Sequence, residues 1–179
     1  METLFFRDLI HILNWIKSNR PIKIALAGSS GVGKSALGGK INESYQEIHH
    51  IEWDLYKHLK PCMVSSLNIE ICLSTLLNDH RIEFILDIPG DTIFKQNKFN
   101  QDRLKIFLNE KQKYGFSVLL LHADKNTVRR RYLSSIKGGT PVCFEIDWNN
   151  WENFEKPFWE KCADYLIDTT YIDLCEVNS

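Results

Sequence analysis

The sequence contains few cysteines, and their arrangement argues against the two kinds of site that cysteines most often build. Their number is odd, and no two of them form a Cys-x-x-Cys pair. A zinc site usually needs such closely spaced ligands, and a disulfide framework pairs an even number of cysteines. We therefore predict reduced, mostly buried thiols, as in a cytosolic protein. The residues concerned are Cys62, Cys72, Cys143, Cys162 and Cys175.

The sequence also lacks a long hydrophobic run and an excess of charge of either sign. No segment approaches the roughly twenty apolar residues that a membrane span needs. Near the amino terminus, polar residues such as Arg7 and Asp8 interrupt the apolar ones, unlike in a signal peptide. With 22 basic and 23 acidic side chains, the net charge is -1, which gives no overall attraction to nucleic acid or anionic lipid. We expect a cytoplasmic protein with no membrane partner and no clear nucleic-acid site.

No internal repeat, low-complexity tract or linker rich in Gly, Pro or Ser divides the chain. Its 179 residues, 44% of them hydrophobic, suffice for one core. We predict that residues 1–179 form a single domain.

Short apolar segments alternate with segments of helical periodicity. Between the predicted strands, helical spacing recurs, beginning with a helix whose apolar face carries Phe6, Leu9, Ile10, Leu13 and Ile16. Residues 67–77 fit both a strand and a helix, and their length favours a helix. The alternation predicts an α/β fold with a parallel sheet covered by helices on both faces. Five strands are predicted, over residues 22–27, 47–53, 82–87, 116–122 and 165–168.

The motif with the clearest chemistry follows the first of these strands and matches Gly-x-x-x-x-Gly-Lys-[Ser/Thr]. Between a strand and a helix, its glycines let backbone N–H groups wrap around a phosphate, and the helix adds its positive end. We expect Lys34 to reach the β- and γ-phosphates and the hydroxyl of Ser35 to coordinate Mg²⁺. The motif therefore predicts a nucleoside triphosphate site. Its residues are Gly28, Ser29, Ser30, Gly31, Val32, Gly33, Lys34 and Ser35.

Carboxylates follow two other predicted strands, at the sheet edge where ligands of open α/β sheets bind. Asp87 ends the strand before Ile88-Pro89-Gly90 and can hold Mg²⁺ directly or through water; the alternative is an Asp that begins a Pro-Gly turn. Asp54 can orient or deprotonate an acceptor hydroxyl; the alternative is a solvent-facing loop acid.

Three adjacent arginines could contribute to the site, but adjacent residues of a helix point in different directions. Arg129, Arg130 and Arg131 lie in a helix opened by Asp124, where successive side chains point about 100° apart, so no more than one or two can reach the same phosphate. We take Arg130 as catalytic and Arg129 as a nucleotide contact, with a solvated basic face as the alternative. Which of the three reaches the nucleotide stays open.

His49 and His50 are adjacent in a predicted strand. Their side chains therefore point to opposite faces, which excludes a shared metal site. We predict a packing or surface role for both.

With these residues the chain resembles the P-loop kinases of the nucleoside and nucleoside-monophosphate kinase group, over about residues 22–174. Trp53-Asp54-Leu55-Tyr56-Lys57 is similar to the Asp-x-x-Tyr-Lys segment of uridine-kinase-like enzymes, whose Asp faces the acceptor hydroxyl. Residues 84–92 resemble the Leu-Asp-Gly-Phe-Pro-Arg-Thr segment of adenylate kinases, without its substrate-binding Arg.

The resemblance implies a three-layer αβα P-loop NTPase fold with a parallel, five-stranded sheet and a small lid at about residues 136–150. It also implies an ATP- and Mg²⁺-dependent kinase that transfers the γ-phosphate to a hydroxyl or phosphate acceptor, such as a nucleoside or nucleotide.

Two other functions remain as alternatives. A Ras-like GTPase switch would explain the phosphate loop and Asp87-Ile88-Pro89-Gly90, which fits an Asp-x-x-Gly switch, but no Asn-Lys-x-Asp guanine reader follows the strand at Leu119. A nucleotide-binding module with degenerate catalysis is the other, because Ser134 or Ser135 replaces the usual second lid arginine. We rank the kinase first.

Overall fold

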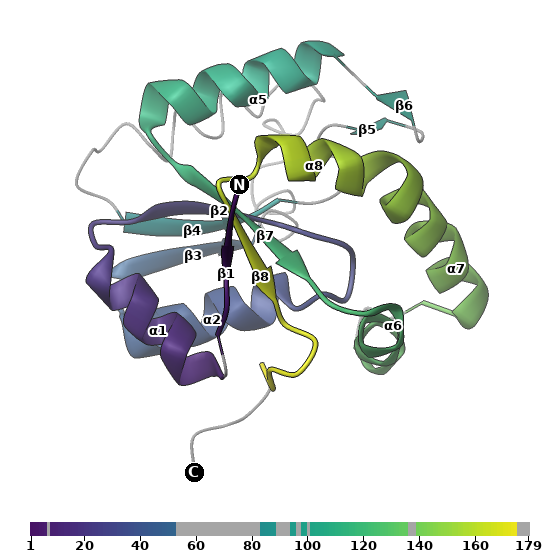
Figure 1. Cartoon of the computed structure of the whole chain (residues 1–179), viewed down its shortest axis with the longest axis horizontal. Coiled ribbons are helices and arrows are strands. Elements are labelled where there is room, and N and C mark those ends of the chain that lie inside the picture. The colour runs from purple at the N-terminus through teal and green to yellow at the C-terminus, as the bar shows by residue number, and fades with distance from the viewer. Residues whose placement is uncertain are drawn as a thin grey trace.

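The centre of the molecule is a six-stranded sheet in which all neighbouring strands are parallel (Figure 1). The computed structural model describes residues 1–6, 8–52, 83–88, 94–95, 98–99, 101–135 and 139–174. The strand order is β1-β8-β7-β2-β4-β3. The strands are β1 (Glu2–Leu4), β2 (Lys23–Ala27), β3 (Ile48–Glu52), β4 (Glu83–Asp87), β7 (Ser117–His122) and β8 (Tyr165–Asp168).

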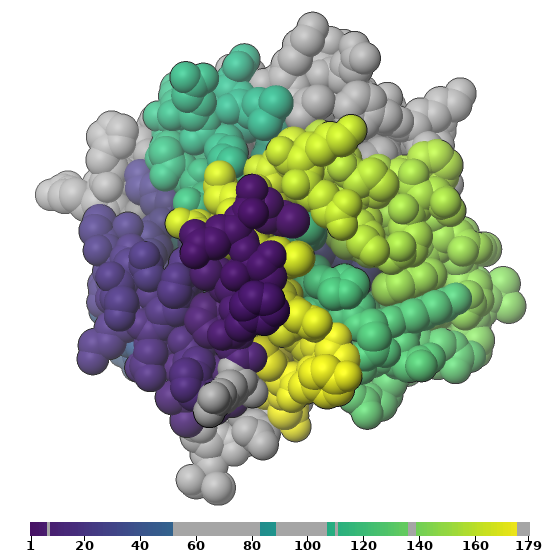
Figure 2. Space-filling view, in the orientation of Figure 1, coloured from purple at the N-terminus to yellow at the C-terminus, as the bar shows by residue number. Residues whose placement is uncertain are grey.

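All five predicted strands are confirmed, and the sheet has one strand more than predicted. The additional strand, β1, pairs with β8 at the sheet edge, from Glu2 opposite Tyr165 to Leu4 opposite Ile167. In the space-filling view, the first residues accordingly lie beside the segment around β8 (Figure 2). Three residues that are mostly exposed carry too little hydrophobic pattern to be predicted as a strand, so only the pairing partner reveals it.

Helices cover both faces of this sheet, as the predicted three-layer architecture requires (Figure 1). A small antiparallel hairpin, β5 (Phe94–Lys95) and β6 (Lys98–Phe99), lies outside the main sheet. The helices are α1 (Leu9–Ser18), α2 (Lys34–Ser44), α5 (Gln101–Tyr114), α6 (Lys125–Ser134), α7 (Pro141–Asn150) and α8 (Lys156–Cys162), with a π-helical turn, η3 (Trp151–Glu155), between the last two. Within the described ranges, no helix is both long and apolar enough to cross a membrane.

Two hydrophobic cores result from the alternation of side chains along the strands. Ile24 and Leu26 of β2 face the core that packs under α1 and α2. Ala25 and Ala27 of the same strand face the core beneath α5 and α8. The four residues from Ile24 to Ala27 are thus each buried on one face of the sheet or the other, which explains the apolar run of this strand.

Two sequence expectations, for the first helix and for the thiols, are modified by the structure. In α1 the buried residues are Leu9, Ile12 and Ile16, whereas Ile10, expected on the apolar face, is 64% exposed. The π-helical turn lies just before α8, whose second residue is Pro157, so the helical path changes where proline disrupts regular helix bonding. The two cysteines of the described ranges are not fully buried: Cys143 is exposed and Cys162 is partly buried.

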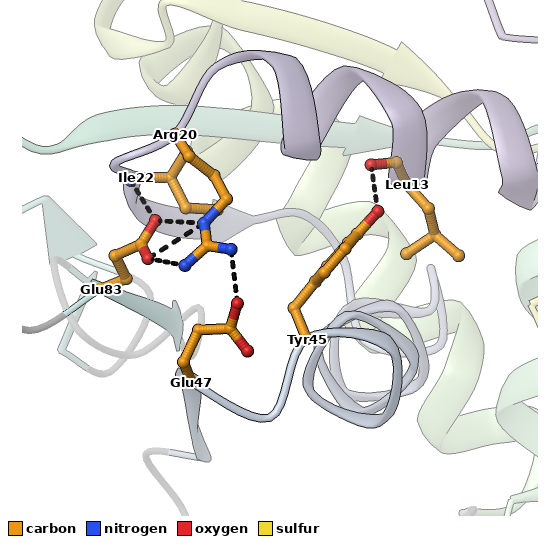
Figure 3. A network of polar contacts seen from close by, with 6 residues as sticks. All are labelled: Leu13, Arg20, Ile22, Tyr45, Glu47 and Glu83. Carbon is orange, nitrogen blue, oxygen red and sulfur yellow. Dashed lines mark hydrogen bonds and ion pairs between the residues drawn. The ribbon is translucent and has the colours of Figure 1, made fainter.

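A cluster of charged residues joins the amino ends of three strands, and we call Arg20, Glu47 and Glu83 the amino-edge cluster (Figure 3). Arg20 Nε donates to both carboxylate oxygens of Glu83 at 3.0 Å, and a further Arg20 nitrogen bonds Glu47. Glu83 also accepts the backbone N–H of Ile22 at 2.9 Å. These hydrogen bonds, chiefly those from Arg20, hold the pKa of Glu83 below its ordinary range.

Candidate active site

The glycine motif forms the loop between β2 and α2, in the strand-loop-helix context that the sequence predicts. β2 lies between β4 and β7, so the loop emerges at the middle of the carboxyl edge of the sheet, the place where open α/β sheets bind ligands. Gly33, immediately before α2, has φ of 108°, which is left-handed. The loop is thus built from a conformation that other residues rarely adopt.

Close packing explains why a side chain does not fit at two of these glycines. A Cβ atom on Gly28 would lie 2.8 Å from the carbonyl oxygen of Leu121. On Gly33 it would lie 2.4 Å from Cδ1 of Leu174. The loop is therefore pressed against β7 on one side and against the segment after β8 on the other, which fixes its backbone.

The ammonium group of Lys34 contacts the backbone of the glycine loop. Its Nζ donates to the carbonyl oxygens of Gly28 at 2.8 Å and Ser29 at 3.1 Å. The helix that Lys34 begins adds its positive amino end at the same point. Backbone N–H groups, a helix terminus and a lysine cation therefore meet at one loop, an arrangement that attracts a phosphate.

Ser35 and Asp87 form the second part of the site. The hydroxyl of Ser35 donates to Oδ2 of Asp87 at 2.6 Å. Asp87 is only 6% exposed, and its Oδ1 has no hydrogen-bond partner among the residues that the structure describes. Leaving such a buried acceptor unpaired costs about 1–3 kcal/mol, so this oxygen is a place where a ligand would be stabilised.

These groups fit a magnesium ion better than a transition metal. Mg²⁺ prefers oxygen ligands and is usually bound by one or two carboxylates, water and the phosphates of a substrate. Ser35 and Asp87 offer oxygen atoms beside the phosphate loop. No cluster of three or more His, Cys, Asp or Glu side chains suited to a metal occurs in the ranges covered by the structure.

His50 is a neighbour of this site that the sequence did not reveal. Its Nε2 lies 3.4 Å from Oδ1 of Asp87, and its side chain is only 10% exposed. The register pairs His50 with Ile85 and Glu52 with Asp87, so the His50 side chain leaves the same face of the sheet as that of Asp87. Only the offset between β3 and β4 brings the two groups together, and strand alternation alone does not supply it.

Among the three adjacent arginines, Arg131 is the one whose guanidinium group lies against the phosphate loop. It donates to the carbonyl oxygens of Val32 at 3.1 Å, Thr169 at 2.9 Å and Ile172 at 2.8 Å. Arg131 thus ties the loop to the turn after β8. The sequence left this choice open, because it depends on the rotation of α6 about its own axis.

Arg129 and Arg130 lie on the exposed side of α6. Arg129 Nε is 3.9 Å from a carboxylate oxygen of Glu145 in α7, and its side chain is 46% exposed. The nucleotide contact assigned to Arg129 and the catalytic role assigned to Arg130 stay predictions.

Asp124 opens α6, as predicted. Its side chain accepts the backbone N–H groups of Asn126 at 2.8 Å and Thr127 at 3.0 Å. Hydrogen bonds from Thr127, first from its side chain and then from its backbone, lower the pKa of Asp124. The carboxylate that follows β7 is therefore used to cap a helix.

The part of the proposed lid that the structure describes is helix α7, which rests on α6. Tyr132 donates its hydroxyl to Asp147 at 2.9 Å, and Lys125 bonds Glu145 at 2.7 Å. Burial, and then the hydrogen bond with Asp147, raise the pKa of Tyr132 to about 12. Residues 136–138 lie outside the described residues, and the lid and single-domain assignments stay predictions.

Two further sequence predictions also fall outside the described residues, namely Asp54 and the helix over residues 67–77. The strand before Asp54 is described and ends at Glu52, which is paired with Asp87. The chain therefore leaves β3 at the same sheet edge as Asp87.

Comparison with known proteins identifies the fold. No known family model matches the sequence, and no curated protein resembles it. Among solved structures, it is similar to shikimate kinase from Acinetobacter baumannii in complex with shikimate, with a TM-score of 0.57, 15% identity, and 91% and 88% of the two chains covered. Shikimate kinase from Bacteroides thetaiotaomicron is also similar, with a TM-score of 0.55 and 15% identity over 82% of this chain and 86% of that one.

A tunicamycin resistance protein from Deinococcus radiodurans is also similar, with a TM-score of 0.55 and 16% identity over 86% of this chain and 89% of that one. At such low identity the likeness shows the fold and leaves the reaction to be argued from the site. The chain has the fold of the P-loop kinases.

Proposed function

We propose that the protein is a Mg²⁺- and ATP-dependent kinase that transfers a phosphoryl group to a small molecule. The observation that carries this proposal is the hydrogen bond between Ser35 and Asp87 beside the glycine loop. It brings together a hydroxyl after the loop lysine and a buried carboxylate at the end of a neighbouring strand. This is the pairing that P-loop enzymes use to hold the metal of a nucleoside triphosphate.

The roles of the individual groups follow from their positions. The N–H groups of the loop and the amino end of α2 would hold the phosphates, and Lys34 would exchange its bonds to the loop carbonyls for phosphate oxygens. Ser35 and Asp87 would hold Mg²⁺, which when bound neutralises charge on the phosphates. We keep Arg129 as a nucleotide contact and Arg130 as the group that stabilises charge on the transferred phosphoryl group.

We further propose that Asp54 acts on the acceptor. It follows β3 by two residues, and β3 ends beside Asp87 at the sheet edge. A carboxylate there can orient an acceptor hydroxyl and accept its proton. The acceptor class is a small hydroxylated molecule such as a nucleoside or nucleotide, and the fold likeness to kinases named for shikimate supports a small-molecule acceptor.

The structure gives two reasons to rank a guanine-specific switch lower. The carboxylate after β7, where a guanine reader would be expected, belongs to Asp124 and is used as a helix cap. Lys98, part of the only Asn-Lys sequence, lies in the β5–β6 hairpin instead of following β7.

A binding module without catalysis is the second alternative, and one observation favours it. The hydroxyls of Ser134 and Ser135 bond carbonyl oxygens of their own helix, at 3.2 Å to Arg131 and 3.1 Å to Tyr132. The positions where a second lid arginine is expected therefore carry no cation. Transfer assays, in addition to binding assays, are needed to separate this function from a kinase.

The experiment that tests the proposed function is a thermal-shift comparison of ATP, ADP and GTP, each with Mg²⁺ and with EDTA. A nucleotide at 100 times its dissociation constant stabilises the folded chain by about 2.7 kcal/mol. We expect ATP with Mg²⁺ to do so, and ATP to bind at least as well as GTP. A phosphate-transfer screen over nucleosides, nucleotides and sugars then identifies the acceptor. Strong selectivity for GTP would favour the switch, and binding without any transfer would favour the module.

A further inference from the structure

We propose that His50 is a positioning residue for Asp87, acting on the carboxylate through the imidazole Nε2. The inference rests on the proposed function, in which Asp87 serves the magnesium ion. It assigns a role to a side chain that the sequence pattern alone places in packing or at the surface.

The first observation is that two polar atoms face each other in a buried place. Nε2 of His50 lies 3.4 Å from Oδ1 of Asp87, with side-chain exposures of 10% and 8%. Neither atom has a hydrogen-bond partner within the described part of the chain. Ordinary N–H···O bonds are about 2.9 Å long, so an approach of about 0.5 Å would form one. The neutral ring would then carry its proton on Nε2.

The second observation is that the two oxygens of Asp87 face different partners. Oδ2 accepts the hydroxyl of Ser35 at 2.6 Å, whereas Oδ1 faces the ring. Once His50 bonds Oδ1, the carboxylate would be held at both oxygens and could not rotate about its last bond. His50 therefore complements Ser35 by fixing the orientation in which Asp87 is presented beside the phosphate loop. Partners of this kind around metal-binding carboxylates are a regular part of metal sites.

The third observation is that helix α2 leaves room for the ring at one residue. A Cβ atom on Gly38 would lie 2.3 Å from Nε2 and 2.4 Å from Cδ2 of His50. Glycine weakens a helix interior relative to alanine, so its presence here needs a reason. Gly39, the next residue, would meet nothing within 4 Å. The steric need for glycine is thus specific to the residue that touches the ring.

The test measures ATP affinity in excess Mg²⁺ and in EDTA, so that the magnesium-dependent gain in affinity is obtained as a ratio. We expect His50→Leu to lower this ratio by about tenfold, the usual loss when the partner of a metal ligand is removed, with little change in EDTA. His50→Gln keeps an amide N–H at a similar distance from the backbone and should restore most of the ratio. The matched control is His49→Leu, since His49 is exposed in the same strand and should leave the ratio unchanged.

Gly38→Ala provides a test in which His50 itself is intact. The added methyl group must displace the ring, so this variant should show the same reduced ratio as His50→Leu, whereas Gly39→Ala should behave as the wild type. In a His50→Ala background, Gly38→Ala should have no further effect. Non-additivity of this kind identifies direct coupling between the two residues.

The outcomes separate this inference from the proposed function. A wild-type chain whose ATP affinity does not depend on Mg²⁺ would overturn both. A wild-type dependence on Mg²⁺ that His50→Leu leaves unchanged would overturn only the positioning role. Equal losses in Mg²⁺ and in EDTA would also overturn it, because they indicate a general packing defect. If His50→Leu does not fold, the pair Gly38→Ala and Gly39→Ala decides by the same criterion.

Discussion

At the amino end of the strands, Arg20, Glu47 and Glu83 bond one another, whereas at the carboxyl end Asp87 and His50 face each other with an unpaired oxygen and nitrogen. Both groups join β3 to β4 through charged or polar side chains. In the amino-edge cluster, Glu83 uses its carboxylate for Arg20 and for the N–H of Ile22. At the carboxyl edge, part of the hydrogen-bonding capacity stays unused.

The two ends of the sheet differ in whether their polar groups are fully hydrogen-bonded, and this difference suggests a stabilising role for one end and a ligand-binding role for the other. Buried polar groups in folded proteins are nearly always hydrogen-bonded, so an exception needs an explanation. The amino-edge cluster is complete without a ligand and needs none. The incomplete pair lies beside the glycine loop, where a metal ion or its water would use the carboxylate lone pairs that Ser35 and His50 leave free. Functional sites are the places where proteins accept such local costs.

The largest expected effect comes from removing the ammonium group of Lys34 from the phosphate loop. Lys34→Ala should lower phosphate transfer by about 10²–10³-fold, the usual loss when one electrostatic contact to the reacting group is removed. The thermal shift with Mg²⁺ and ATP should largely disappear, while the unliganded chain stays folded. Lys40→Ala is the control, because Lys40 lies in the same helix and pairs with Glu43. An unchanged thermal shift in Lys34→Ala would remove the loop from the proposed function.

The next effect distinguishes the roles that we propose for Asp54 and Asp87. Asp54→Asn keeps the shape of the side chain but removes the charge that accepts a proton, so transfer should fall by about 10²-fold with ATP affinity near that of the wild type. Asp87→Asn should instead reduce the part of ATP affinity that depends on Mg²⁺. Both variants are compared by calorimetry with and without Mg²⁺ and by transfer to the acceptor. Normal turnover in Asp54→Asn would exclude it as the acceptor-side acid.

A smaller effect compares two glycines with left-handed backbones. Gly33→Ala adds a methyl group where φ is 108° and Leu174 is already close, so it should destabilise the fold by about 1–3 kcal/mol and also weaken ATP binding. Gly115→Ala, at φ of 63° with nothing within 4 Å, should destabilise by about 1 kcal/mol without changing ATP affinity. Urea unfolding and ATP titration of both variants provide the measurements. Equal ATP affinities in the two would contradict a specific role for the loop backbone.

The smallest effect belongs to the amino-edge cluster. Glu83→Gln should destabilise the fold by about 1 kcal/mol through the loss of charge-assisted hydrogen bonds, and ATP affinity should not change. Glu47→Gln, at a more exposed residue of the same cluster, should have a smaller effect on stability. A change in ATP affinity in either variant would contradict the view that the amino-edge cluster stabilises the fold without affecting nucleotide binding.

The stabilisation that Glu83 provides should depend on pH, and Glu83→Gln can test this. Because Arg20 lowers the pKa of Glu83 below its ordinary value of 4.5, the folded chain favours the charged carboxylate. The resulting stabilisation is present above about pH 4.5 and is lost as the pH falls through the lowered pKa. The difference in Tm between wild type and Glu83→Gln should therefore be largest near neutral pH and shrink in acid. A difference that stays constant into acid would contradict this account.

The features that the sequence predicted well are those determined by neighbouring residues. The glycine loop is recognised from eight consecutive residues between a strand and a helix. Asp124 is recognised as a helix cap because its partners, Asn126 and Thr127, follow within three residues. Asp87 is expected at the site because it ends an apolar strand. In each case, the physical cause and the sequence signal occupy the same short segment.

The features that were missed depend on segments that meet only in the folded chain. β1 becomes a strand by pairing with β8, which lies more than 150 residues later. Arg131 contacts the phosphate loop because the turn after β8 supplies carbonyl oxygens on its side of α6. His50 reaches Asp87 only through the register of β3 with β4 and the space above Gly38. A local pattern contains none of this information.

The hydrogen bonds of Arg131 bear on which segments of the chain unfold together. Its guanidinium group bonds the carbonyl of Val32 in the phosphate loop and those of Thr169 and Ile172 beyond β8. Leu174 adds an apolar contact to Gly33 from the same turn. The loop and this turn are therefore expected to unfold locally as one cooperative unit. In amide hydrogen exchange, a ligand on the phosphate loop would then slow exchange in residues 169–174 as well, although those residues come almost 140 positions later in the chain.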